Sequence, residues 1–273
     1  MFDLIYTSPS GRTWHLSRYT HEGVFVDEGG VEGLVGAVEE QVFASVGRAG
    51  QRLAGQQAQP LSGGLSVSVV GTADRSVMDA WLEFRADWSV RVPGTLTVVS
   101  PVLGSVSTPV RLREVPAAPT KFLEPGAGDS MSLRLVGDDG VWWGSWLRVV
   151  SSGGDVSSVT VTNPGDVTVW PRLRVDRGCT GTITLPSGKQ VSMTVPDDDE
   201  RAAGRWLLLD ESESCAVLDE NDRIDRALWL ETRPGVVTEG VPPGTERTYR
   251  IQRAAGDGTV AIEWRPGYMD PWR

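Results

Sequence analysis

Residues 159–175 alternate between apolar and polar side chains on both sides of a short turn. They read V-T-V-T-N-P-G-D-V-T-V-W-P-R-L-R-V. A period of two residues is typical of a half-buried β-strand, and Asn163-Pro164-Gly165-Asp166 has the composition of a tight turn. The pattern therefore predicts two β-strands joined by a tight reversal, and no residue in it is equipped for catalysis.

The same alternation recurs through the first half of the chain. It predicts strands at Phe2–Tyr6, Thr13–Leu16, Leu65–Val69, Thr95–Val99, Val110–Val115 and Ser130–Val136. In Val31–Arg52, Leu34, Val38 and Val42 have helical spacing, but several glycines weaken a helix. We therefore expect irregular and extended structure in that range.

One helix is predicted, near residues 74–88. Its apolar stripe consists of Val77, Trp81, Phe84 and Trp88, and Thr72 or Asp74 is placed to cap its first turn. The stripe is most simply explained as core packing. Residues 1–140 are thus expected to form a β-domain with one helix packed on a sheet.

The second domain is expected to span residues 141–273. It follows Gly137-Asp138-Asp139-Gly140, and after Ser151 the pattern is almost purely β, with frequent turns and no useful helical stripe. This spacing favours a sandwich or jelly roll. Two hairpins are predicted: Ile183 to Val195 around Pro186-Ser187-Gly188, and Tyr249 to Trp264 around Gly256-Asp257-Gly258.

Composition excludes several classes of function. The chain has 273 residues and a formal net charge of −10, and Lys121 and Lys189 are its only lysines. Because affinity for phosphate backbones rises with clustered basic charge, we expect no specific nucleic-acid binding. No apolar run is long enough to span a bilayer and no export signal is recognisable, so we expect no membrane insertion.

The cysteines indicate no crosslinked framework. Cys179 and Cys215 lie far apart and lack C-x-x-C spacing, which argues against a disulfide scaffold and a zinc site. Two buried, reduced thiols are preferred, as expected for folding in a reducing cytoplasm, although a single bridge between them stays open.

Catalytic and cofactor motifs are absent from the sequence. His15 and His21 are the only histidines, and no G-x-S-x-G elbow or phosphate-binding loop accompanies them. The acidic runs Asp197–Glu200 and Asp219–Asp222 fail the spacing of a calcium loop and are better explained as solvated turns. We therefore expect no catalytic residue, no cofactor and no metal, and hence no enzyme.

Eleven tryptophans are unusual for this length. Trp142, Trp143 and Trp146 could form a platform on which sugar rings stack, or they could anchor a domain or subunit interface. We prefer the interface, because aromatic residues are generally enriched there. Arg172, Arg174 and Asp176 alternate with apolar residues, which fits either a solvated strand face or a polar subunit contact.

The order of these features resembles a known family. A β-domain with one helix is followed by Trp143 at the domain crossing, by Asn163, Pro164, Gly165 and Asp166 in a turn, by Pro171, and by Trp264, Pro266 and Tyr268 near the end. In this order the chain resembles the distal tail proteins of long-tailed, non-contractile phages, the minor tail proteins common in phages of actinobacteria. The resemblance spans essentially the whole chain.

The resemblance implies a structural role at the tip of a virion's tail. The expected fold is mainly β, with an N-terminal split β-barrel and a C-terminal galectin-like β-sandwich. Six copies would close into a ring between the tail-tube protein and the tail-associated hub or fibre protein. The ring would leave a channel for the tape-measure protein and DNA, and assembly would take place in the host cytoplasm.

Two other functions stay open. A carbohydrate-binding module for host adhesion would need Trp142, Trp143 and Trp146 exposed on one concave face. The second half has no histidine, which departs from the sugar-contacting pattern of galectins and argues against that module. A glycan-cleaving enzyme would need two carboxylates across a cleft, and no pattern indicates them.

Overall fold

The protein is mainly β and divides into two compact units. The computed structural model describes residues 2–17, 22–44, 46–47, 49–118, 128–151, 156–198, 204–210 and 212–273. Unit 1 contains Met1–Gly144 and Tyr268–Arg273, and unit 2 contains Ser145–Gly267. Residues 141–144 and 268–273 were expected in the second domain, whereas here they are grouped with unit 1. The mainly β fold class predicted from the alternating runs is confirmed.

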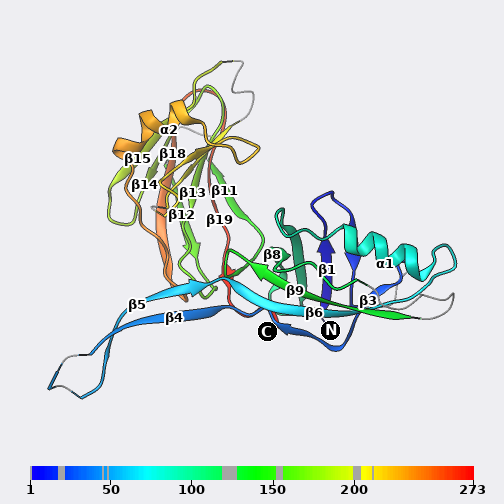
Figure 1. Cartoon of the computed structure of the whole chain (residues 1–273). Helices are drawn as coiled ribbons and strands as arrows, with labels where there is room; N and C mark the ends of the chain where they lie inside the picture. The colour runs from blue at the N-terminus through cyan, green and yellow to red at the C-terminus, as the bar shows by residue number, and fades with distance from the viewer. Residues whose placement is uncertain are drawn as a thin grey trace. The chain divides into compact units, whose positions relative to one another are not determined.

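Unit 1 is built on an antiparallel sheet in the order β2-β1-β7-β8-β9-β6-β3 (Figure 1). Its strands are β1 (Asp3–Thr7), β2 (Thr13–His15), β3 (Val24–Gly33), β6 (Leu61–Val69), β7 (Gly94–Ser100), β8 (Gly104–Leu112) and β9 (Asp129–Gly137). The short strand β10 (Trp142–Trp143) pairs with β8 and with β20 (Gly267–Tyr268). Because β8 is shared between the two halves of the sheet, both halves contribute side chains to one core.

The predicted helix is present as α1 (Val77–Ala86). Its cap is Ser76, whose Oγ accepts a hydrogen bond of 3.1 Å from the backbone N of Asp79, so the predicted caps Thr72 and Asp74 were wrong. Thr72 instead closes a small turn through backbone hydrogen bonds with Arg75, which delays the start of the helix. The predicted stripe is buried, as expected for core packing.

A two-stranded ribbon projects from the sheet of unit 1 (Figure 1). It consists of β4 (Ala37–Phe43) and β5 (Arg52–Gln59), which among the described strands pair only with each other. We call these two strands the arm. The sequence predicted extended structure here, but its glycines hid the regular pairing of the two strands.

Unit 2 is a sandwich of two antiparallel sheets (Figure 1). One sheet has the order β11 (Leu147–Ser151), β19 (Val260–Trp264), β13 (Arg172–Val175), β16 (Arg205–Leu208) and β17 (Val217–Leu218). The other has the order β12 (Ser157–Thr162), β18 (Glu246–Ala255), β14 (Thr180–Thr184) and β15 (Gln190–Thr194). Alternate residues of both sheets fill one core, so the predicted sandwich is confirmed.

Two predicted reversals connect different sheets. β12 and β13, on either side of Asn163–Asp166, belong to opposite sheets, and so do β18 and β19 around Gly256–Gly258. The predictions of a tight reversal and of a closing hairpin were therefore wrong. A hairpin and a crossing between sheets both direct every second side chain to the same core, so alternation does not distinguish them. The hairpin β14–β15 is confirmed.

A second helix, α2 (Arg226–Thr232), was not predicted. It is followed by a 3-10 turn, Arg233–Gly235, and it starts at Asp225, whose carboxylate accepts a hydrogen bond of 3.2 Å from Leu228 N. Only Leu228 and Thr232 are buried in α2. A helix this short with two buried positions shows no stripe in the sequence.

The cap of α1 gives a first prediction. Ser76→Ala removes the acceptor for Asp79 N and should lower the free energy of unfolding by about 1 kcal/mol. Asp74→Ala is the control, and because Asp74 caps nothing it should change that free energy by less than about 0.5 kcal/mol. Urea denaturation followed by tryptophan fluorescence measures both, and a larger loss for Asp74→Ala would contradict the assignment.

Candidate functional site

The base of the arm is fixed by buried hydrogen bonds. The indole Nε1 of Trp142 donates to the Leu34 carbonyl at 2.8 Å, and both side chains are fully buried. Leu34 has a φ of 56°, which is rare for a residue with a branched side chain. Its own N–H donates to Ser62 O at 3.1 Å, and Gly36 N donates to Met269 O at 2.6 Å. The chain is therefore held firmly where it leaves the sheet to form the arm.

The C-terminal segment Tyr268–Arg273 completes this anchor. The Trp272 ring meets the ring of Trp142 edge-on at 6.4 Å between centroids and that of Phe2 at 5.8 Å. Tyr268 is buried in the core of unit 1. Ser100 Oγ donates to the Arg273 carbonyl. Two residues singled out in the sequence, Trp142 and Tyr268, thus belong to the same core.

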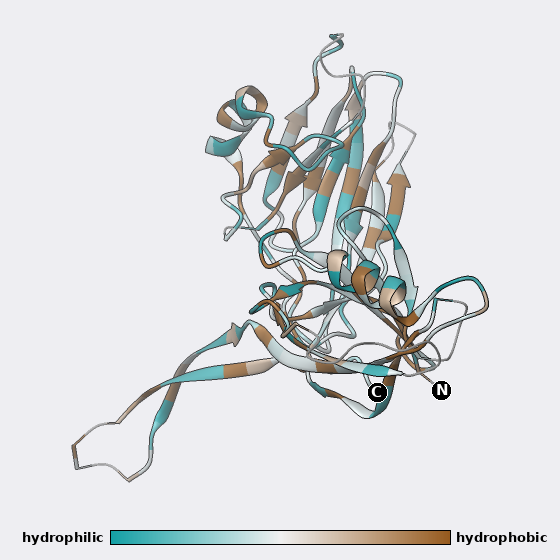
Figure 2. Ribbon diagram, turned by 45° about the vertical axis from the view of Figure 1, so that its right-hand side comes forward, coloured by the Kyte–Doolittle hydropathy of each residue, from teal (hydrophilic) through white to brown (hydrophobic). Residues whose placement is uncertain are grey.

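The arm itself exposes apolar side chains. All residues of β4 are exposed, and Figure 2 shows hydrophobic and hydrophilic residues mixed along the ribbon. Val42 and Leu53 face each other across the strands at 41% and 54% exposure, and Phe43 is 71% exposed. A two-stranded ribbon is only marginally stable in water on its own. An apolar ribbon on a firm base therefore fits contact with another polypeptide.

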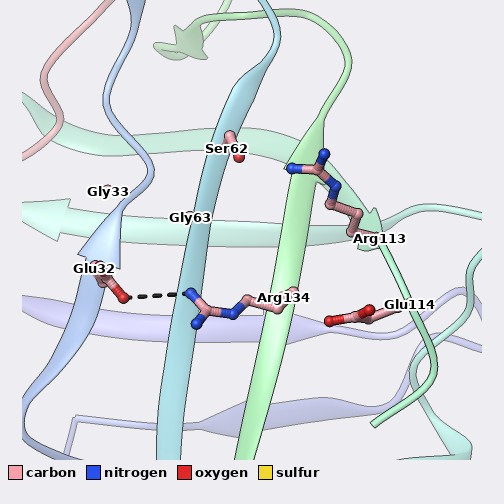
Figure 3. Close-up of a pocket in the computed structure, with 7 residues that line it drawn as sticks. All are labelled: Glu32, Gly33, Ser62, Gly63, Arg113, Glu114 and Arg134. Atoms are coloured by element: carbon pink, nitrogen blue, oxygen red, sulfur yellow. Dashed lines mark hydrogen bonds and ion pairs between the residues drawn. The ribbon is translucent and has the colours of Figure 1, made fainter.

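A polar hollow of about 520 Å³ lies over β3, β6 and β9 (Figure 3). It is lined by Glu32, Gly33, Ser62, Gly63, Arg113, Glu114 and Arg134. A Cβ at Gly63 would lie 2.2 Å from the Glu32 carbonyl oxygen, so the close approach of β3 and β6 requires glycine there. Arg134 and Glu32 form an exposed ion pair at 3.4 Å, a kind that contributes little stability. The balanced charges favour no particular ion.

The turn at Asn163–Asp166 is structural. Asn163 is fully buried, and its Nδ2 donates to the carbonyls of Val167 and Val241, each at 2.8 Å. Its Oδ1 accepts from Gly165 N at 3.0 Å. A Cβ at Gly165 would lie 2.4 Å from Gly267 O, which also accepts a hydrogen bond from Asp166 N at 2.8 Å. This turn therefore fastens the crossing between the two sheets to the end of unit 2.

The other family-motif residues have varied surroundings. Pro171, Trp264 and Pro266 are buried in unit 2, whereas Pro164 is exposed. Trp143 is half-buried, and its Nε1 donates to Asp139 Oδ2 at 2.8 Å. None of these arrangements places a side chain for chemistry, which fits a scaffolding role.

The three neighbouring tryptophans are not equivalent. Trp142 is completely buried and cannot offer a ring face to a sugar. Trp146 is 44% exposed, but the guanidinium of Arg172 lies 3.7 Å from its ring centroid and that of Arg265 lies 4.9 Å away. A platform that used all three rings is therefore not formed.

The outer face of the five-stranded sheet carries a buried carboxylate that the sequence did not reveal. Glu263 Oε2 accepts hydrogen bonds from Arg172 Nε at 2.9 Å and from Trp206 Nε1 at 2.8 Å. Beside it, Arg174 pairs with Asp176 at 2.7 Å. Burial acts to raise the pKa of Asp176, but hydrogen bonds from Thr259 and the charge of Arg174 outweigh it and lower that pKa. This predicted charged face is thus an ordered network.

The acidic runs give no metal site in the part of the chain that the structure describes. There, no group of three or more His, Cys, Asp or Glu side chains is arranged to hold an ion. Asp219 accepts hydrogen bonds from the backbone N atoms of Asn221 and Arg223, which lower its pKa. Asp199 and Glu200 lie outside the described residues. Neither described helix is long and apolar enough to cross a membrane.

The cysteines are not bridged to each other. Cys179 is buried in the core of unit 2, and its sulfur accepts a hydrogen bond from Gly258 N at 3.0 Å. Cys215 is partly exposed, so the expectation that both thiols are buried was right only for Cys179.

The fold is similar to that of phage proteins. The Dit protein of phage SPP1, described as a paradigm of the hub adsorption apparatus in phages that infect Gram-positive bacteria, matches with a TM-score of 0.59 and 12% identity over 98% of this chain and 99% of that one. A chain of the phage P2 baseplate in its activated conformation with Ca matches with a TM-score of 0.57 and 7% identity over all of both chains. A chain of the phage p2 baseplate in its activated conformation with Sr matches with a TM-score of 0.52 and 8% identity, over 94% of this chain and 99% of that one.

No known family profile and no curated protein matches the sequence. At these low identities the likeness lies in the fold, which extends over the whole chain. The resemblance to distal tail proteins is thus confirmed at the level of fold.

The anchor of the arm gives a second prediction. Trp142→Phe keeps an aromatic side chain but replaces the indole with a smaller ring and leaves the buried Leu34 carbonyl without its donor, and should lower the free energy of unfolding by at least about 2 kcal/mol. The amide of Gly36 should also exchange faster with solvent. Trp143→Phe is the matched control and should cost less than about 1 kcal/mol, because its partner Asp139 is exposed to water. An equal decrease in the free energy of unfolding in the two variants would argue against the anchoring role of Trp142.

The buried amide of Asn163 gives a third prediction. Asn163→Ala removes three buried hydrogen bonds and should lower the free energy of unfolding by about 3 kcal/mol, because the Val167 carbonyl and Gly165 N lose the partner described above, whereas the Val241 carbonyl keeps its bond from Val169 N. Thr162→Ala, at the neighbouring exposed position, should change it by less than about 0.5 kcal/mol. Chemical denaturation of both variants tests the difference, and a stability of Asn163→Ala close to that of the parent would refute the role of the network.

Proposed function

We propose that this chain is a structural component of a phage tail tip, because its fold matches that of a phage hub protein over nearly its full length. In this proposal copies of the chain close into a ring, with six as the expected number. The ring joins the tail tube to the hub or fibre proteins and leaves a channel for the tape-measure protein and DNA. The chain acts as a scaffold in the virion and catalyses no reaction.

The arm is the observation that supports self-assembly most directly. Its base is fixed by Trp142 and by the segment Tyr268–Arg273, while Val42, Phe43 and Leu53 are exposed. Burial of apolar side chains stabilises a contact by about 25 cal/mol of free energy for each Å² of apolar surface removed from water. Contact with a neighbouring copy would remove that surface, and closed rings arise when each copy uses such a contact in the same way.

The proposal predicts that the arm is needed for assembly and is dispensable for folding. Phe43→Ser combined with Leu53→Ser should shift the purified protein from a ring to a monomer, because both side chains lie outside either core. The unfolding midpoint measured at monomer concentrations should stay within about 2 °C of the parent. Light scattering after size-exclusion chromatography measures the shift in mass.

A matched control tests whether the loss of assembly is specific to the arm or follows from any exposed apolar residue being replaced by serine. Val102→Ser changes a 74% exposed residue between β7 and β8 and should leave the assembled mass unchanged. Electron microscopy of the parent, alone and with its tube and hub neighbours, reports the ring and its copy number. A parent protein that stays monomeric at high concentration and with those neighbours would contradict the proposal.

A further inference from the structure

The edge strand β11 of unit 2 is unusually apolar. It ends the five-stranded sheet, so one row of its backbone groups has no neighbouring strand among the described residues. Leu147, Val149 and Val150 are 36–46% exposed, and Arg148 between them is also exposed. The strand has no proline and no bulge in its register with β19. Such an edge is a template for pairing with another strand.

The other edges of the same sandwich are protected. β17, at the opposite end of the five-stranded sheet, has only two residues. On β12 the exposed residues are Ser158, Thr160 and Thr162, and on β15 they are Gln190, Ser192 and Thr194. Short strands and polar surfaces are the usual means by which proteins prevent edge pairing. Among the described edge strands of unit 2, β11 alone is neither very short nor polar on its exposed positions.

A network of arginines and tryptophans borders this edge. The guanidinium groups of Arg265 and Arg172 lie over the ring of Trp146. Those of Arg172 and Arg174 lie 5.4 and 5.3 Å from the ring centroid of Trp206. Arg148, on β11 itself, lies 3.5 Å from the buried Glu263. Three of these arginines, Arg148, Arg172 and Arg174, pair with two carboxylates, Glu263 and Asp176. The surface is thus locally positive on a chain whose net charge is −10.

We propose that β11 and the adjoining arginines form a docking site for an extended, acidic segment of another protein. The segment adds a strand to the sheet at β11, where backbone hydrogen bonds supply affinity. Its apolar residues lie on the face of Leu147 and Val149, opposite the face that carries Arg148 and Val150. Its carboxylates lie near Arg148 and Arg265, and this complementarity selects acidic over basic segments. The site belongs to unit 2 and does not depend on the ring.

The test uses the full chain and three blocked peptides of about seven residues, the usual length of a strand. One alternates valine with glutamate, one alternates valine with lysine, and the third is the glutamate peptide with N-methyl groups on the amides that would face β11. Fluorescence anisotropy measures binding, and amide exchange followed by NMR locates it. We expect the glutamate peptide alone to bind and to protect the amides of residues 147–151.

Two variants make the test specific to the edge. Val150→Glu places a like charge against the acidic peptide and should weaken binding at least about tenfold. Thr160→Glu makes the same change on the polar edge strand β12 and should have no effect on binding. Thermal unfolding of both variants confirms that they are folded.

Several outcomes would overturn this proposal. They are the absence of binding and protection at millimolar glutamate peptide, equal binding of the lysine or N-methylated peptide, and binding that Val150→Glu leaves unchanged. Pairing of two copies through β11, seen by sedimentation as a dimer that Val150→Glu dissociates, would replace the proposed partner with a second copy of this chain.

Discussion

The buried hydrogen bond from the Trp142 indole to the Leu34 carbonyl determines where the arm begins. Leu34 adopts a left-handed backbone conformation, which turns the chain out of β3 and toward β4. A buried carbonyl without a donor is costly, so the hydrogen bond and the turn support each other. Because no other described strand of unit 1 pairs with the arm, its direction depends on this small anchored base.

Unit 2 depends on a comparable arrangement around Asn163. One amide side chain satisfies three backbone groups at the point where the chain passes from one sheet to the other. The two sheets can therefore share one core without a hairpin between β12 and β13. The turn residues that first suggested a phage protein thus act through backbone hydrogen bonding.

Local patterns in the sequence were sufficient for strands such as Leu65–Val69 and for the stripe of α1, because each reflects burial of one face. They did not reveal which sheet a strand joins, as at β18 and β19, since both possibilities bury the same residues. The anchoring role of Trp142 was also hidden, because its partner is a backbone carbonyl 108 residues away. Glu263 gave no signal either, since its arginine and tryptophan partners come from other strands.

The return of Tyr268–Arg273 to unit 1 makes unit 2 an insertion within a single chain. The core of unit 1 needs residues from both sides of that insertion, including Trp142 and Tyr268. During translation, the base of the arm therefore cannot be completed until all of unit 2 has been synthesised.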